Sequence, residues 1–126
     1  MKVSRLDHLV LTVRDLDATV RFYTDVLGME PVTFGAGRKA LRFGNQKINL
    51  HQAGHEFEPK ADKPTPGSAD LCFIIEGSLE EAAERLTSLN VDIIEGPVER
   101  TGAVGELTSL YVRDPDLNLV EIAVYA

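Results

Sequence analysis

Residues 6–30 read LDHLVLTVRDLDATVRFYTDVLGME and pass from a strand pattern into a helix pattern. Residues 6–13 are a largely apolar run rich in β-branched side chains, which is typical of a strand. Asp15 is a residue that caps helices, and apolar side chains then recur at roughly helical spacing as far as Leu27. Gly28 is suited to end that helix. The stretch therefore predicts a strand followed at once by an amphipathic helix.

Three more strands are expected after this helix, with glycine-containing turns between them. They are Glu30–Phe34, Lys39–Phe43 and Lys47–His51, and the turns lie at Gly35–Gly37 and Gly44–Asn45. The following segment, residues 53–68, holds three prolines and two glycines without periodicity, which indicates a connecting loop. The first half therefore reads strand, helix, strand, strand, strand.

The same order begins again after the loop. The expected elements are a strand at Asp70–Ile75, a helix from a Ser78 cap to Asn90, and strands at Val91–Glu95, Glu106–Val112 and Asn118–Val124. The repeat predicts an α+β fold of two βαβββ modules, about 3–52 and 69–126, joined by a linker at about 53–68. We expect one domain over residues 1–126, in which two mixed sheets form a U-shaped cleft.

Composition limits the partners that the chain can have. With 13 basic and 20 acidic residues among 126, the net charge is −7, and there is no basic stripe. Such a chain repels phosphate backbones, which argues against nucleic acid and leaves small molecules or a metal. No apolar run approaches a membrane span, and the N-terminus does not resemble a signal peptide. The single Cys72 forms no internal disulfide, so we expect a cytoplasmic protein.

Three side chains with metal-ligand chemistry lie on three different predicted strands. His8 is in the first strand, His51 ends the fourth, and Glu121 lies in the middle of the last, NLVEIAVY. Both faces of the first strand are apolar, so His8 is expected in a half-enclosed place. A carboxylate inside an apolar strand is costly unless it is paired or bound to a cation. Together the three would leave open positions on Zn²⁺, Ni²⁺, Mn²⁺ or Fe²⁺.

Each of these residues also has a plain structural interpretation. His8 suits a hydrogen-bonded core histidine, His51 a surface histidine at a strand end, and Glu121 a partner of Arg42 or Arg113. His55 lies four residues after His51, but Gly54 and the strand alternation argue against a helix there, so the two do not form a helical pair of ligands.

Other polar residues are candidates for contact with a substrate. Asn49 shares a strand face with His51, Asp70 opens the fifth strand, and Ser109 and Tyr111 share a face of theirs. Arg100 and Thr101 fall in ERTGAVG, which we interpret as a loop that folds over a ligand. Arginine in such a loop either binds carboxylate or phosphonate or is simply solvated. Cys72 lies in an apolar strand, where a core role is favoured over a nucleophilic one.

The whole chain resembles the vicinal oxygen chelate superfamily. Residues 6–30 resemble its opening module and RDPDLNLVEI its closing strand. The superfamily includes glyoxalase I, fosfomycin-resistance thiol transferases, extradiol dioxygenases and bleomycin-resistance proteins. RKALRFGNQKINLHQAG, EFEPKA and GPVERTGA are similar to the glyoxalase-domain-containing protein 5 group and to bacterial virulence-protein or lactoylglutathione-lyase-like members.

The resemblance implies paired βαβββ modules around a divalent metal that chelates vicinal oxygens of the substrate. His8 and Glu121 fall at the first-strand and last-strand ligand positions. Asn49 stands where glyoxalase I has a glutamate, and Asp70 stands where it has a histidine, so methylglyoxal chemistry is in doubt. The third ligand remains open between His51, two residues past Asn49, and Asp70. The resemblance also implies a homodimer.

Two functions of different class follow. The first is a metal-dependent lyase or isomerase acting on a small oxygen-rich substrate such as a thiol conjugate, with Glu121 as base if it is displaced from the metal. Thiol transfer and extradiol dioxygenation are other reactions that such a metalloenzyme could catalyse. The second is a metal-free protein that binds a small molecule, as bleomycin-resistance proteins do.

Overall fold

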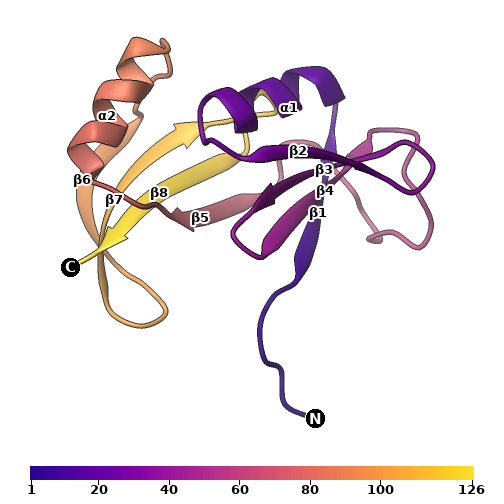
Figure 1. The fold of residues 1–126 in the computed structure, drawn as a ribbon, viewed down its shortest axis with the longest axis horizontal. Helices are drawn as coiled ribbons and strands as arrows, with labels where there is room; N and C mark the ends of the chain where they lie inside the picture. Colours follow the sequence, from indigo (N-terminus) through magenta and orange to yellow (C-terminus); the bar gives the residue numbers. More distant parts are fainter. The chain divides into compact units, whose positions relative to one another are not determined.

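The computed structural model describes residues 1–126 and consists of two compact units, Met1–Pro66 and Gly67–Ala126. The first contains β1 (His8–Val13), α1 (Leu16–Asp25), β2 (Glu30–Phe34), β3 (Arg38–Phe43) and β4 (Gln46–Gln52). The second contains β5 (Asp70–Ile74), α2 (Leu79–Ser88), β6 (Glu95–Thr101), β7 (Glu106–Arg113) and β8 (Leu119–Tyr125). Each unit is therefore a βαβββ module, and the predicted α+β class is confirmed (Figure 1).

The two sheets have the same topology. Their strand orders are β1-β4-β3-β2 and β5-β8-β7-β6. The first and last strands of each module pair in parallel, and the other neighbours pair antiparallel, so both sheets are mixed. This equivalence shows that the sequence repeat is a structural repeat.

Both helices begin where the capping residues indicated. The Asp15 side chain accepts a hydrogen bond from the amide of Ala18 at 3.0 Å, and Ser78 accepts one from Glu81 at 3.1 Å. These bonds satisfy amide groups that a helix leaves free at its start. Gly28 has a φ of +70°, which explains why the chain turns after α1 at a glycine.

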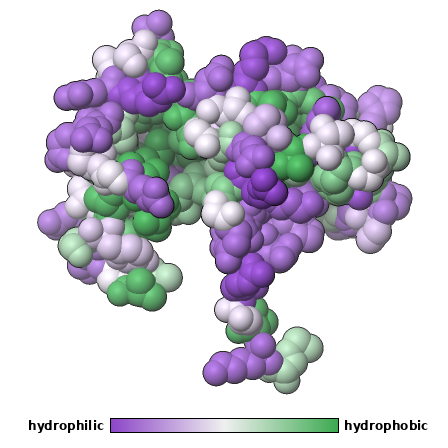
Figure 2. Space-filling view, viewed as in Figure 1, coloured by the Kyte–Doolittle hydropathy of each residue, from purple (hydrophilic) through white to green (hydrophobic).

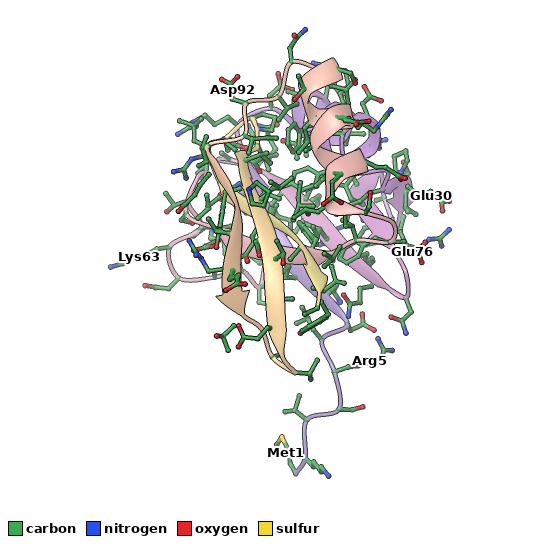
Figure 3. The ribbon with its side chains drawn as sticks, turned by 90° about the vertical axis from the view of Figure 1, so that its left-hand side faces the viewer. Met1, Arg5, Glu30, Lys63, Glu76 and Asp92 are labelled. Atoms are coloured by element: carbon green, nitrogen blue, oxygen red, sulfur yellow. The ribbon has the colours of Figure 1, made fainter.

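One face of each sheet carries the hydrophobic core of its unit. In the first unit, Leu41 and Ile48 are fully buried along with Tyr23 of α1. In the second, Val112 and Val120 are fully buried, and Leu86 of α2 is 2 % exposed. Figure 3 shows α2 beside the strands of its own unit. Because side chains alternate along a strand, the opposite faces of the two sheets hold the polar residues considered below.

The segment before β1 is extended and exposed. Figure 1 shows it leading away from β1, and Figure 3 places Met1 and Arg5 along it. In the space-filling view it stands clear of the rest of its unit (Figure 2). Neither α1 nor α2 has the length and apolar character needed to cross a bilayer.

The strand predicted at Val91–Glu95 is wrong. Residues 91–94 have no regular structure, and β6 begins only at Glu95. Residues 99–101 of the segment read as a glycine-bearing loop are instead the end of this strand, because its register with β7 continues as far as Thr101. Gly96 and Pro97 obscured the pattern, since both residue types are unusual inside a strand. The register is irregular between Glu95 and Val98.

Candidate functional site

Strand pairing places a row of polar residues on one face of the first sheet. Val10 is the register partner of Asn49, and Thr12 is the partner of His51. His8 pairs with Lys47 at the start of the same row. Across β4 from β1, Ala40 is the partner of Asn49, so Arg38 and Arg42 share this face. We call this the first polar face.

His8 lies at the edge of the first polar face, and its ring is held by its neighbour. Its Nδ1 is 2.8 Å from Oδ1 of Asp7, and this hydrogen bond lowers the pKa of the Asp7 carboxyl. The Asp7 carboxylate favours the tautomer with the proton on Nδ1, which leaves the lone pair of Nε2 for a ligand. The His8 side chain is 45 % exposed at the start of the edge strand β1, so it is about half-enclosed.

His51 occupies a different environment on the same face. It is only 3 % exposed, so the surface interpretation is wrong for it. Its Nε2 lies 3.3 Å from Nη2 of Arg38, and the Phe57 ring packs edge-on at 5.5 Å. Burial lowers its pKa, and the charge of Arg38 lowers it further, while Glu56 has a weaker opposing effect. His51 is therefore a neutral acceptor for Arg38 at neutral pH.

The structure does not bring His8 and His51 together. His51 lies beside Thr12, four residues along β1 from His8. Four strand residues span roughly 13 Å, and Nε2 of His51 faces Arg38 of β3, on the other side of β4 from β1. The first unit therefore offers His8 as a ligand without His51.

Sequence reasoning missed Arg38. Its guanidinium carbon lies 4.5 Å from the centre of the Phe57 ring and 5.1 Å from that of Phe34. Lys47 contacts the same Phe34 ring, with Nζ 3.8 Å from its centre. The alternation RKALRF placed Arg38 on the face of Asn49 and His51 and was the signal that could have found it. The contact with Phe57 depends on the fold of the 53–68 segment and had no such signal.

The second sheet has a corresponding polar face, which we call the second polar face. Cys72 of β5 and Tyr111 of β7 are the register partners of Glu121 on its two sides. Asp70 and Ser109 lie on the same face, because Asp70 is two residues from Cys72 and Ser109 is two residues from Tyr111. Cys72 is exposed here, so its expected place in the core is wrong.

Glu121 is held by a hydroxyl group and not by an arginine. The Ser109 Oγ donates to Oε2 of Glu121 at 2.6 Å, and Ser109 itself is fully buried. Arg42 pairs instead with Glu30 at 2.9 Å, and Arg113 donates to the carbonyl of Leu117. The second oxygen of Glu121 is not taken by either arginine proposed from the sequence.

The charge of Glu121 affects the groups beside it. Burial first, and then the Glu121 charge and hydrogen bond, raise the pKa of the Cys72 thiol to about 11. Burial also raises the pKa of Tyr111, and Glu121 adds to the shift, against a hydrogen bond from Arg100 that lowers it. Both groups are therefore protonated donors at neutral pH.

Arg100 and Thr101 belong to β6, so the expected loop over a ligand is wrong. Their side chains lie on opposite faces of the strand. The Arg100 Nε donates to the Tyr111 hydroxyl at 3.0 Å, and its Nη2 lies 3.3 Å from Oε1 of Glu95. Thr101 pairs with Glu106 at the strand end and is exposed. Arg100 belongs to the second polar face and Thr101 does not.

Comparison with known proteins identifies the family. The model of the glyoxalase/bleomycin resistance protein/dioxygenase superfamily matches residues 5–122. The chain belongs to this superfamily.

Two curated relatives are similar over almost the whole chain. Virulence protein STM3117 of Salmonella typhimurium is 58 % identical over 99 % of this chain and 87 % of its own length. Glyoxalase domain-containing protein RDO1 of Mycosarcoma maydis is 58 % identical over 99 % of this chain and 70 % of its own length. A more distant relative, metallothiol transferase FosB of Shouchella clausii, is 27 % identical over 95 % of this chain and 80 % of its own length.

Solved structures agree with this placement. The crystal structure of STM3117 has a TM-score of 0.99 and covers 100 % of both chains. A lactoylglutathione lyase from Agrobacterium tumefaciens has a TM-score of 0.75 at 26 % identity, covering 98 % of this chain and 96 % of its own. The superfamily includes enzymes and binding proteins, so membership alone does not select an activity.

The register shows how the superfamily repeat places the candidate ligands. His8 opens β1 as Asp70 opens β5. The partner of His8 in β4 is Lys47, and Asn49 lies two residues further along. The partner of Asp70 in β8 is Leu119, and Glu121 likewise lies two residues further along. Asn49 and Glu121 are therefore equivalent, whereas His51 is equivalent to Ala123. Each unit therefore carries one residue of ligand type, His8 or Glu121, and one further oxygen-bearing side chain on the same face, Asn49 or Asp70.

Within the structure, no three histidine, cysteine, aspartate or glutamate side chains gather as a metal site. The individual donors still fit a divalent cation. The Asp7–His8 pair matches the carboxylate–histidine arrangement that supports metal ligands, and Ser109 orients Glu121 in a comparable way. The Oδ1 atom of Asn49 is buried without a hydrogen-bond donor.

Proposed function

We propose that this protein is a metal-dependent enzyme of the glyoxalase I-like group, with lyase or isomerase chemistry on a small oxygen-rich substrate. His8 and Glu121 would hold the divalent cation, with Asp70 as the third protein ligand. An imidazole and carboxylates suit Zn²⁺, Ni²⁺, Mn²⁺ or Fe²⁺. When bound, such an ion polarises substrate oxygens.

The observation that carries this proposal is that both principal donors are already oriented. Asp7 fixes the His8 ring at 2.8 Å, and Ser109 fixes the Glu121 carboxylate at 2.6 Å. Partners of this kind hold ligands in the geometry that metal binding needs.

The chain's own residues also supply groups for moving a proton. Glu121 is the base in this proposal, and its carboxylate would have to leave the cation to take a proton from a carbon next to a substrate carbonyl. Ser109 would stay hydrogen-bonded to its Oε2. Tyr111, kept protonated by burial and by Glu121, is placed beside it as a donor to a substrate oxygen.

The proposal includes a homodimer located in the cytoplasm. The resemblance to superfamily members supports the homodimer. Pairing of two chains would cover the edge strands that each sheet exposes.

The principal alternative is a metal-free protein that binds a small molecule. It is favoured by Asn49 and Asp70, which stand in place of two ligands of glyoxalase I. Thiol transfer is the second enzymatic variant, supported by the similarity to FosB.

Metal content separates the enzyme from the binding protein. We expect protein dialysed against Zn²⁺, Ni²⁺, Mn²⁺ or Fe²⁺ in turn to retain close to one equivalent of one of them, measured by plasma mass spectrometry. His8→Ala and Glu121→Ala should each lose it. His55→Ala and Glu99→Gln, which change exposed residues outside both polar faces, should keep it. Retention by the first pair, or no retention by the wild type, would exclude the metal site.

A further inference from the structure

We propose that the first polar face contains a binding site for a small hydroxycarboxylate, built around Arg38. The site lies wholly within the first unit. It extends beyond the proposed function, because its residues bind the ligand whether or not a metal is present.

Arg38 carries a positive charge that no carboxylate neutralises. Its guanidinium lies against the rings of Phe34 and Phe57, and its Nη2 meets the neutral acceptor His51. Its Nε is buried without an acceptor. Arg42, two residues along the same strand, is in contrast fully paired with both oxygens of Glu30 at 2.9 Å. A guanidinium held in one position with donors to spare binds a carboxylate well.

Lys47 adds a second positive charge to the same surface. It is half-buried, and its ammonium rests on the Phe34 ring that Arg38 also contacts. The acidic side chain whose charge acts on His51 is that of Glu56. Its carboxylate is already used, since it accepts from the amide of Gly54 and lies 4.0 Å from Lys60. Lys47 also acts on the Asp7 carboxylate, so an anion from outside the chain is the missing partner of Arg38, with Lys47 beside it.

Asn49 determines what else the ligand must carry. It is 6 % exposed, and its Oδ1 has no donor within the protein. Buried acceptors are almost always satisfied, so the donor must come from outside the chain. Asn49 lies two residues before His51 in β4, and Arg38 lies opposite His51. Asn49 is therefore roughly 7 Å along the strand from the level of Arg38. A carboxylate that also bears a hydroxyl group can serve both residues.

The test is a titration of the isotopically labelled full chain in EDTA, followed by proton–nitrogen NMR. The probe is glycolate, with acetate, the neutral analogue glycolamide and inorganic phosphate as comparisons. We expect glycolate to shift the Arg38 Nε–Hε and Asn49 side-chain signals in a saturable way. Acetate should bind more weakly and shift only the Arg38 signal, and glycolamide should not saturate.

Variants locate the effect. Arg38→Gln should weaken glycolate binding at least about tenfold, and Lys47→Gln a few-fold. Arg42→Gln should bind as the wild type does. The same spectra report whether each variant is folded, and Lys47→Gln still tests the site if Arg38→Gln is not.

Absence of saturable shifts, equal binding by glycolamide, tighter binding of phosphate, or unchanged binding by folded Arg38→Gln and Lys47→Gln would each overturn the proposal. Because EDTA removes divalent cations, a failure here leaves the metal measurement above untouched, and the reverse also holds.

Discussion

The hydroxyl of Ser109 donates a 2.6 Å hydrogen bond to the carboxylate of Glu121, from the neighbouring strand of the same sheet. Ser109 is fully buried, so water does not compete for this bond. The contact fixes the direction of the one carboxylate in the middle of β8. It is the most specific support that either polar face gives to a candidate ligand.

Ser109→Ala should therefore lower metal affinity more than it lowers stability. Loss of a group that orients a ligand typically reduces affinity about 10- to 100-fold. We expect a weakening of at least about tenfold by isothermal titration with the metal that the wild type retains. Thr108→Ala, on the opposite face of β7, is the control and should leave the affinity unchanged. Equal affinities for the wild type and Ser109→Ala would show that Glu121 needs no such support.

Stability should fall in mild acid because His51 is buried in its neutral form. Its pKa is lowered from an ordinary value of 6.5, so the unfolded chain takes up the proton first. The stabilisation is thus complete above about pH 6.5 and is lost as pH falls through the folded pKa. Urea unfolding at pH 7.5 and 5.5 should show a smaller loss in His51→Gln than in the wild type. His55→Gln, which alters an exposed histidine, should behave as the wild type does.

Cys72 should be a poor nucleophile although it is exposed. Its pKa of about 11 leaves almost no thiolate at neutral pH. Its reaction with a disulfide reagent should be slower than that of glutathione at pH 7.5 and should accelerate towards pH 11. Glu121→Gln removes a negative charge next to the thiol and should shift this rise to lower pH. A fast wild-type reaction at pH 7.5 would contradict the assigned environment.

Leu117 occupies a backbone conformation that suits glycine. Its φ is +70°, and its side chain is 65 % exposed, so it packs little while bearing the steric cost of a left-handed residue. Leu117→Gly should raise the free energy of unfolding by about 1 kcal/mol, and Leu117→Ala should change it by less than about 0.5 kcal/mol. Chemical denaturation measures both. A destabilised glycine variant would mean that the leucine side chain contributes more than its exposure indicates.

Sequence pattern alone was sufficient for most of the architecture. Apolar spacing, Asp15, Ser78 and Gly28 located both helices, and the repeated order gave two equivalent mixed sheets. These features are local, because a cap or an alternation acts on its immediate neighbours. The same local rules misplaced this strand: residues 91–94 have no regular structure, and pairing with β7 makes residues 95–101 a strand although Gly96 and Pro97 favour a loop.

The character of each polar residue was decided only by the tertiary structure. The alternation of side chains along a strand placed Asn49, His51 and Glu121 on polar faces. The burial, partners and protonation of these residues depend on other segments. Phe57 and Arg38 turn His51 into a buried neutral acceptor, and Ser109 takes the place of the arginine expected at Glu121. The order of the chain thus determined which strands form, because that information lies within a few residues. Which charges are satisfied was determined by folding, because their partners come from distant parts of the sequence.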